Sequence, residues 1–227
     1  MDTQNTTCWT LIHEAAKGDN VARDAFARRY LPVARAYLGA RWVTASRKQE
    51  IEDALQQVFI ECFRDGGALQ RVQQERPGGF RAFLYGVTRN VALRVESRRP
   101  ADRAVTAGID VAEQVPASDE DRLTRVFDRA WARTVMRDAA SRMSDMAVAG
   151  GPDAARRVEL LRLRFQEGLP IRDIADRWRA DPVQVHREYA KARKEFKKAL
   201  LEVMSFHHPD AAEEAETECS RLLELLA

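Results

Sequence analysis

The chain has 227 residues, of which 45% are hydrophobic and 32% charged, with 11 glycines, 8 prolines and a net charge of +2. This length suits two domains of ordinary size, and this composition excludes collagen-like and low-complexity disordered chains. No apolar run approaches the roughly 18 residues that a membrane span requires. The first residues lack the basic and apolar segments of a secretory signal, and the three cysteines are far apart. We therefore expect a reduced, cytoplasmic protein with no membrane partner.

The net charge conceals a segregation along the sequence. Residues 1–100 hold 16 basic and 11 acidic side chains, and residues 122–205 hold 19 and 12. Residues 101–121 and the tail 206–227 each hold one basic and six acidic side chains. This pattern predicts two basic domains, an acidic linker and an acidic tail. Basic domains favour a polyanionic partner because bound phosphates release counterions, but solvated helix faces explain surpluses of this size equally well.

Residues 1–100 contain four stretches in which apolar residues recur at helical spacing. The stretches are centred on residues 11–16, 26–38, 51–63 and 80–91, and the last must end before Pro100. Gly18 and Asp19 are typical of a helix C-cap followed by an N-cap. Residues 65–79 hold four glycines and a proline, which predicts a loop. We expect a four-helix N-terminal domain.

Residues 101–121 lack periodicity and predict a flexible linker. A long helix is expected from about Asp121 to the break at Gly150–Pro152, and a shorter one with Val158, Leu161 and Phe165 that ends at Gly168. Helices from 171 to about 179 and from Pro182 to about 204 follow, the last capped by Asp181. No segment alternates with a period of two. The predicted fold is all-α, with two helical domains.

The segment 171–196 predicts a helix-turn-helix, in which the start of the second helix enters the major groove of DNA. Val185 and Tyr189 are expected to point inward. The outward positions, which suit contacts to bases and phosphates, are Gln184, His186, Arg187, Lys191 and Arg193. Glu188 is awkward on such a face and either accepts from a cytosine or lies out of reach. An ordinary helical hairpin with a solvated face is the alternative.

Several motifs resemble the extracytoplasmic-function class of bacterial RNA polymerase sigma factors. The second block reads EGLP at 167–170, DIA at 173–175, VH at 185–186 and KAR at 191–193, where the family commonly has EGLS, EIA, VK and RAR. The first block contributes EIEDALQQVF at 50–59 and FRAFLYGVTRN at 80–90. The matches occur in the right order in both basic blocks, which then correspond to region 2-like (1–100) and region 4-like (122–205) domains.

The resemblance implies roles for matching residues. The helix at 50–63 is expected to dock on core RNA polymerase through Glu52, Asp53, Gln56 and Gln57. The loop 65–79 and the helix 80–99 are expected to melt and read the −10 promoter element, with Arg89, Asn90, Arg94, Arg98 and Arg99 as the contacts. The helix 182–195 is expected to read the −35 element of promoter DNA. Phe80 and Phe83 are possible stacking platforms, but their spacing fits a core position better.

The sequence also departs from the family pattern. Arg179 stands where the turn commonly has glycine, which implies either a slightly different turn or a left-handed arginine. Residues 186–188 are unusual for the family, so its promoter sequence does not carry over. The tail 206–227 predicts a short amphipathic helix, which either packs on the second domain or covers a DNA-facing surface. The acidic linker either enters the RNA channel of polymerase or serves solubility.

No enzyme motif is present: there is no phosphate-binding glycine loop, paired-histidine zinc motif or nucleophile elbow. We expect no catalysis, no cofactor and no metal. The main alternative function is a conventional helix-turn-helix repressor or activator whose residues 1–100 sense a signal or dimerise. A helical adaptor that does not read DNA is a third possibility. Relatives of this class are often controlled by an anti-sigma protein, by phosphorylation or by their tails, and the sequence leaves these open.

Overall fold

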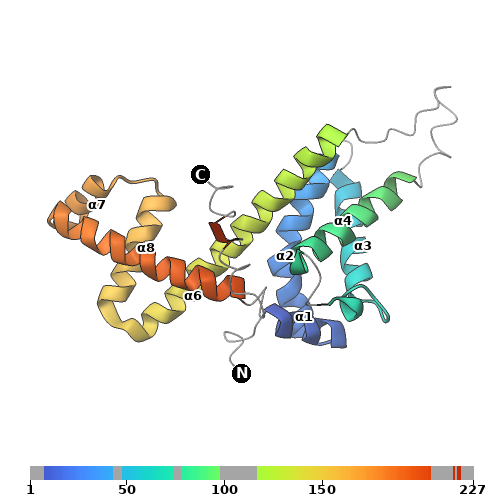
Figure 1. Ribbon diagram of the computed structural model, residues 1–227, viewed down its shortest axis with the longest axis horizontal. Helices are drawn as coiled ribbons and strands as arrows, with labels where there is room; N and C mark the ends of the chain where they lie inside the picture. The colour runs from blue at the N-terminus through green and yellow to red at the C-terminus, as the bar shows by residue number, and fades with distance from the viewer. Residues whose placement is uncertain are drawn as a thin grey trace. The chain divides into compact units, whose positions relative to one another are not determined.

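The computed structural model describes residues 8–42, 48–73, 78–97 and 117–205, together with residues 217, 219 and 220. Figure 1 shows its helices: α1 (Cys8–Lys17), α2 (Asn20–Arg41), α3 (Lys48–Phe63), the 3₁₀ turn η3 (Leu69–Arg71), α4 (Gly79–Ser97), α6 (Ala117–Phe165), α7 (Ile171–Trp178) and α8 (Pro182–Ser205). The described residues contain no strand, so the all-α prediction is confirmed. None of the described helices has the length and apolar character needed to cross a membrane.

The predicted caps between the first two helices are present. Gly18 has φ +102°, and the backbone N–H of Asp19 donates to the Glu14 carbonyl at 3.1 Å, which closes α1 as a Schellman turn. The Asp19 side chain then accepts from the Ala22 N–H at 2.7 Å and begins α2. One residue pair thus ends one helix and starts the next.

The chain divides into two compact units, and the division lies inside α6. Unit 1 contains the described residues up to Thr134, and unit 2 contains Val135–Ser205 with residues 217, 219 and 220. We expected the second domain to begin at residue 122, after a linker at 101–121. Residues 98–116 lie outside the described residues, and residues 117–121 are already helical. The segment 117–134 therefore belongs with the N-terminal helices.

Aromatic side chains form the core of unit 1. The rings of Phe26, Tyr30 and Phe80 lie 4.8–5.8 Å from one another, and all three are buried. Phe80 and Phe83 are only 1% and 6% exposed. Their predicted core position is confirmed, and neither presents a free face for stacking on a base.

The first part of α6 completes this core. Leu123, Phe127 and Trp131 are at most 2% exposed, and the Trp131 ring stacks on Tyr30 with centroids 5.7 Å apart. Burying three such side chains stabilises the packed state by roughly 5–9 kcal/mol. The buried Asp128 also forms an ion pair with Arg81 of α4 at 2.9 Å. These contacts explain why the segment belongs to unit 1.

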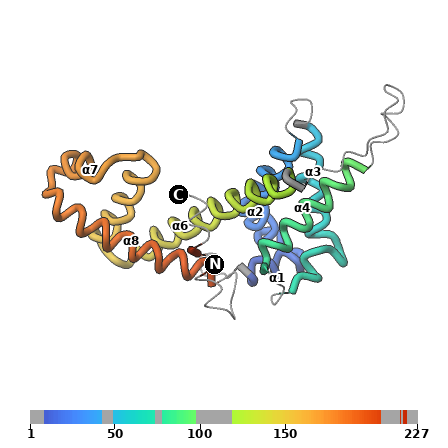
Figure 2. Tube along the Cα trace, turned by 45° about the horizontal axis from the view of Figure 1, so that its top comes forward, coloured from blue at the N-terminus to red at the C-terminus, as the bar shows by residue number. Residues whose placement is uncertain are grey.

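Unit 2 consists of the rest of α6 with α7 and α8. The predicted break in α6 is present at Gly151, whose φ of 76° and ψ of −170° are open essentially only to glycine. Beyond it, Leu160 and Leu163 pack with Ile171, Ile174 and Val185 in one buried cluster. Figure 2 traces α7 and α8 on either side of the short turn that connects them.

Candidate nucleic-acid interface

The turn between α7 and α8 is built by the backbone. Arg179 adopts the left-handed conformation, with φ 50° and ψ 46°. The Ala180 N–H donates to the Ala175 carbonyl at 3.0 Å and the Arg179 N–H to the Asp176 carbonyl at 3.1 Å, as in a Schellman motif. Of the two possibilities for Arg179, the structure therefore selects the left-handed arginine, at a conformational cost of about 1 kcal/mol.

Asp181 starts α8 as predicted. Its side chain accepts from the Val183 N–H at 3.1 Å, and its carbonyl accepts from the Val185 N–H at 3.1 Å. Pro182 occupies the first helical position, where its missing N–H costs nothing. The end of α7 is secured by the Trp178 ring, which lies 4.5 Å from the Arg156 guanidinium of α6. The two helices of the motif are therefore fixed by caps, by the core and by this contact.

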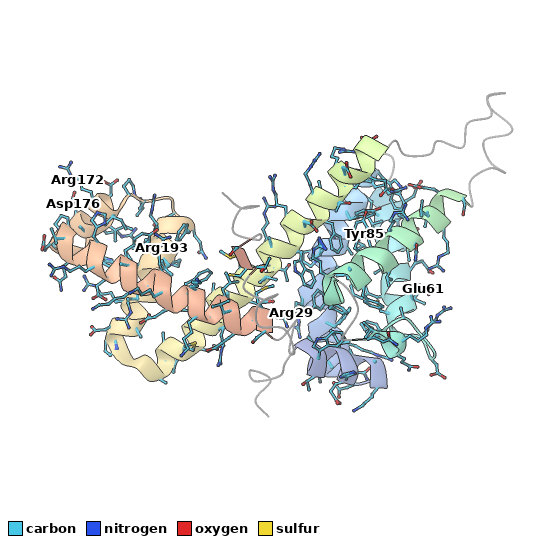
Figure 3. All side chains as sticks on the ribbon, viewed as in Figure 1. Arg29, Glu61, Tyr85, Arg172, Asp176 and Arg193 are labelled. Atoms are coloured by element: carbon cyan, nitrogen blue, oxygen red, sulfur yellow. The ribbon has the colours of Figure 1, made fainter. Side chains whose placement is uncertain are left out.

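The outward face of α8 carries the predicted reading residues. All five are exposed: Gln184, His186, Arg187, Lys191 and Arg193. Val185 is 2% exposed and packs inward, and Tyr189 is half-buried, as predicted. Figure 3 labels Arg193 on α8, whose guanidinium lies 5.9 Å from the Tyr189 ring, and the exposed Arg172 and Asp176 on α7. An exposed polar face at the start of a capped helix suits the major groove of DNA.

Glu188 has a structural role that the sequence did not reveal. Its carboxylate accepts from Lys191 at 2.8 Å and from Arg157 of α6 at 3.4 Å, and it is only half-exposed. The hydrogen bond from Lys191, with help from Arg157, lowers the pKa of Glu188 despite some desolvation. Arg157 also donates to Glu195 at 2.8 Å, two turns further along α8. Arg157 therefore ties α8 to α6, and Glu188 lies between Arg157 and Lys191 of the reading face.

The predicted polymerase-docking residues share one face of α3. Glu52, Asp53, Gln56 and Gln57 are all exposed, whereas the opposite face, with Ala54, Leu55, Val58 and Cys62, is buried. Ile60 continues the outer face and is 51% exposed. Glu52 receives a bidentate pair from Arg35 of α2, which lowers its pKa through the hydrogen bond. The face therefore combines one paired carboxylate, one acid in reach of Gln49, two amides and an apolar side chain.

The predicted −10 residues on α4 differ in their surroundings. Asn90 is exposed, but Arg94 is bound by Glu61 of α3 at 2.6 Å, which lowers the pKa of that carboxyl. Figure 3 labels Glu61 on α3. Arg89 is bound by Glu120 of α6 at 3.3 Å. Arg98 and Arg99 lie outside the described residues. The two described arginines are therefore ion-paired within unit 1 and do not form a free basic track.

Glu120 is the residue that the sequence interpretation missed, because it was assigned to the linker. Its carboxylate accepts from Arg41 of α2 at 3.1 Å and from Arg89 and Tyr85 of α4 at 3.3 Å each. Burial opposes ionisation, but the two arginines outweigh it and lower the pKa of Glu120. The sequence held one signal for this role: an acidic residue at the end of the expected linker, close to the apolar residues 123, 127 and 131.

Residues 217, 219 and 220 are the described part of the acidic tail. The predicted tail helix with Leu222, Leu223, Leu225 and Leu226 lies outside the described residues, whereas Cys219 is described and buried.

Cys62 is buried as well, and burial raises the pKa of its thiol to about 12. Within the described part of the chain, no three His, Cys, Asp or Glu side chains form a possible metal site.

No protein-family model matches this sequence, and no curated protein matches it.

Proposed function

We propose that this protein is a promoter-specificity subunit of bacterial RNA polymerase, a sigma factor of the extracytoplasmic-function class. In this proposal unit 2 reads the −35 element as duplex DNA and unit 1 binds core polymerase and the −10 element. The protein acts by binding and positioning, without chemistry of its own.

The observation that carries the proposal is the helix-turn-helix of unit 2. A capped α8 presents Gln184, His186 and Arg187 within its first two turns, which is where such a helix meets base edges. Glutamine suits adenine and arginine suits guanine through paired hydrogen bonds. Lys191 and Arg193, one to two turns further along, suit phosphates. The fixation of α8 by Arg157 supports a rigid reading helix, since a helix free to rotate would lose its register on the bases.

A second feature separates a sigma factor from other helix-turn-helix proteins. The outer face of α3 is polar and acidic with an exposed isoleucine, whereas nucleic acid favours basic surfaces. Such a mixed face, with an exposed isoleucine next to carboxylates and amides, suits a protein partner. Its match to the EIEDALQQVF motif supports core polymerase as that partner.

The test is run-off transcription from promoter fragments of the source genome, using purified core polymerase with and without the full chain. We expect specific transcripts that require the protein and that are lost in the double variant E52K/D53K. The matched control is D24K, which reverses an exposed acid of α2 that pairs with Arg28 on the same helix. This control is expected to retain transcription.

Other outcomes would overturn the proposal. A protein that fails to bind core polymerase, dimerises and binds an operator alone would be a conventional repressor or activator. A protein that binds polymerase and keeps its activity when Arg187 and Lys191 are reversed would be an adaptor that does not read DNA.

A further inference from the structure

Three donors from two helices converge on one carboxylate in unit 1. The Arg41 Nη1 atom lies 3.1 Å from Glu120 Oε1, and the Arg89 Nε and Tyr85 Oη atoms lie 3.3 Å from Oε2. Figure 3 labels Tyr85, whose hydroxyl also contacts the Thr124 hydroxyl at 3.1 Å. Two guanidinium groups and a hydroxyl around one oxyanion form the type of site that binds a phosphate.

The donors differ in how strongly they depend on Glu120. The Arg41 side chain is 2% exposed and donates twice to Glu96, at 2.8 and 2.9 Å, so it keeps a bidentate partner if Glu120 leaves. The Arg89 side chain is 40% exposed and, among the described residues, forms its ion pair with Glu120. Arg89 is therefore the donor that an external anion can reach and that gains most from one.

The position of Glu120 allows its carboxylate to move away from its partners while α6 stays docked on the other helices of unit 1. It lies in the first turn of α6, three residues after Ala117, and its side chain is 24% exposed. The anchors of the segment are further along, at Leu123, Phe127 and Trp131, all buried in unit 1. The exchange of a partly exposed ion pair at a helix end costs little compared with undocking those three residues.

We propose that Glu120 is an internal competitor for the backbone phosphate of single-stranded DNA at Arg89. In the free protein the carboxylate fills the anion site made by Arg89, Tyr85 and Arg41, and a phosphate of the bound strand replaces it. This inference builds on the proposed function, because it regulates the surface assigned there to the −10 element. It predicts that unit 1 binds single strands weakly until Glu120 is displaced.

The test measures binding of the full chain to a short fluorescein-labelled single-stranded DNA of mixed sequence by fluorescence anisotropy. We expect E120Q to bind about three- to fivefold more tightly than the wild type, the gain typical of releasing one partly exposed ion pair. The matched control is D119N, which makes the same charge change one residue earlier, where the carboxylate faces Arg122 at 3.6 Å. D119N is expected to bind like the wild type.

A second substitution assigns the gain to Arg89. R89A is expected to weaken binding in the wild-type background and to abolish the gain in the E120Q background, so that E120Q/R89A binds like R89A. If E120Q binds no more tightly than D119N, or if its gain persists with R89A, the competitor role is wrong. A urea titration of E120Q shows whether α6 stays docked. If α6 undocked, the urea midpoint of unfolding would fall as far as it does when the Trp131 side chain is removed. The binding assay contains no polymerase. Failure of run-off transcription would therefore not affect the competitor role of Glu120, and failure of the binding assay would not affect the sigma-factor assignment.

Discussion

The arginines of α4 in unit 1 and those of α8 in unit 2 lie in different surroundings, although the sequence predicted contact with DNA for both. Arg89 and Arg94 are each bound by a carboxylate from another helix, Glu120 and Glu61. In the described part of the chain, the exposed Arg187 has no ion-pair partner, and Arg193 lies over the Tyr189 ring. The same side chain is therefore available in one unit and occupied in the other.

Exposure of a basic residue is therefore not enough to define a binding surface. An arginine already paired with a carboxylate exchanges one anion for another when DNA binds, so the net gain is small. An unpaired arginine loses only water and counterions. We infer that the arginines of α8 are ready to bind DNA, although Lys191 beside them pairs with Glu188, and that the arginines of α4 must first be released by their internal acids.

The largest expected effect tests whether the segment that carries Glu120 belongs to unit 1 at all. Trp131 is 2% exposed and stacks on Tyr30, so W131A leaves a cavity and is expected to lower the free energy of unfolding by about 3–5 kcal/mol. Urea denaturation followed by far-UV circular dichroism measures it. V148A, at a residue 87% exposed, is the control and is expected to change stability by less than about 0.5 kcal/mol. Equal stabilities of the two variants would show that the segment does not pack in unit 1, and Glu120 could then not occupy Arg89.

The next prediction compares an unpaired arginine of α8 with an ion-paired arginine of α4. R187A removes an unpaired arginine from the reading face and is expected to weaken binding of duplex promoter DNA by about 1–3 kcal/mol, roughly tenfold or more. R94A removes an arginine that Glu61 already binds and is expected to weaken it by less than about twofold. Gel-shift titrations of the promoter fragment with the variant and core polymerase give both values. Losses of the same size would show that pairing by Glu61 does not matter.

Much of the helical structure could be predicted from the sequence, because its signals are local. The caps at Gly18–Asp19 and Asp181–Pro182 and the break at Gly151 each depend on a few adjacent residues. The outward face of α8 followed in the same way, since a buried Val185 fixes which positions point out. Local rules also favoured the core position of Phe80 and Phe83.

The contacts that determine availability could not be predicted, because they join residues far apart in the sequence. Arg89 meets Glu120, and Arg157 meets Glu188, only after helices pack together. The composition of residues 101–121 predicted a linker, because an acidic stretch without strong periodicity is typical of one. The apolar residues from 123 onward instead bring the end of that stretch, residues 117–121, into the helix packed on unit 1. Residues 122–134 were expected in the second domain for the same reason, because their contacts with unit 1 are also long-range.

A smaller effect concerns the pH dependence of the Glu120 site. Arg41 and Arg89 lower the pKa of Glu120 below its ordinary value of 4.5 in the folded protein, despite the opposing effect of burial. A lowered folded-state pKa means that the ion pair stabilises fully above 4.5 and is lost as the pH falls through the folded value. We expect E120Q to be less stable than the wild type by about 0.5–1 kcal/mol at neutral pH, and equally stable in acid. Urea titrations at both conditions, with D119N as the control, measure this; a difference that does not shrink in acid would mean that Glu120 is not held by its charge.

The smallest effect sharpens the description of unit 2. Arg179 occupies a left-handed position that favours glycine, so R179G is expected to raise the free energy of unfolding by about 0.5 kcal/mol, once the extra freedom of glycine in the unfolded chain is included. R179A keeps the Cβ atom and is expected to resemble the wild type, which separates backbone strain from loss of the arginine side chain. Both variants are expected to bind promoter DNA as the wild type does, because the reading residues start at Gln184. If both variants instead bind more weakly while R179G is more stable, the Arg179 side chain contacts DNA. The reading face would then extend from α8 into the turn.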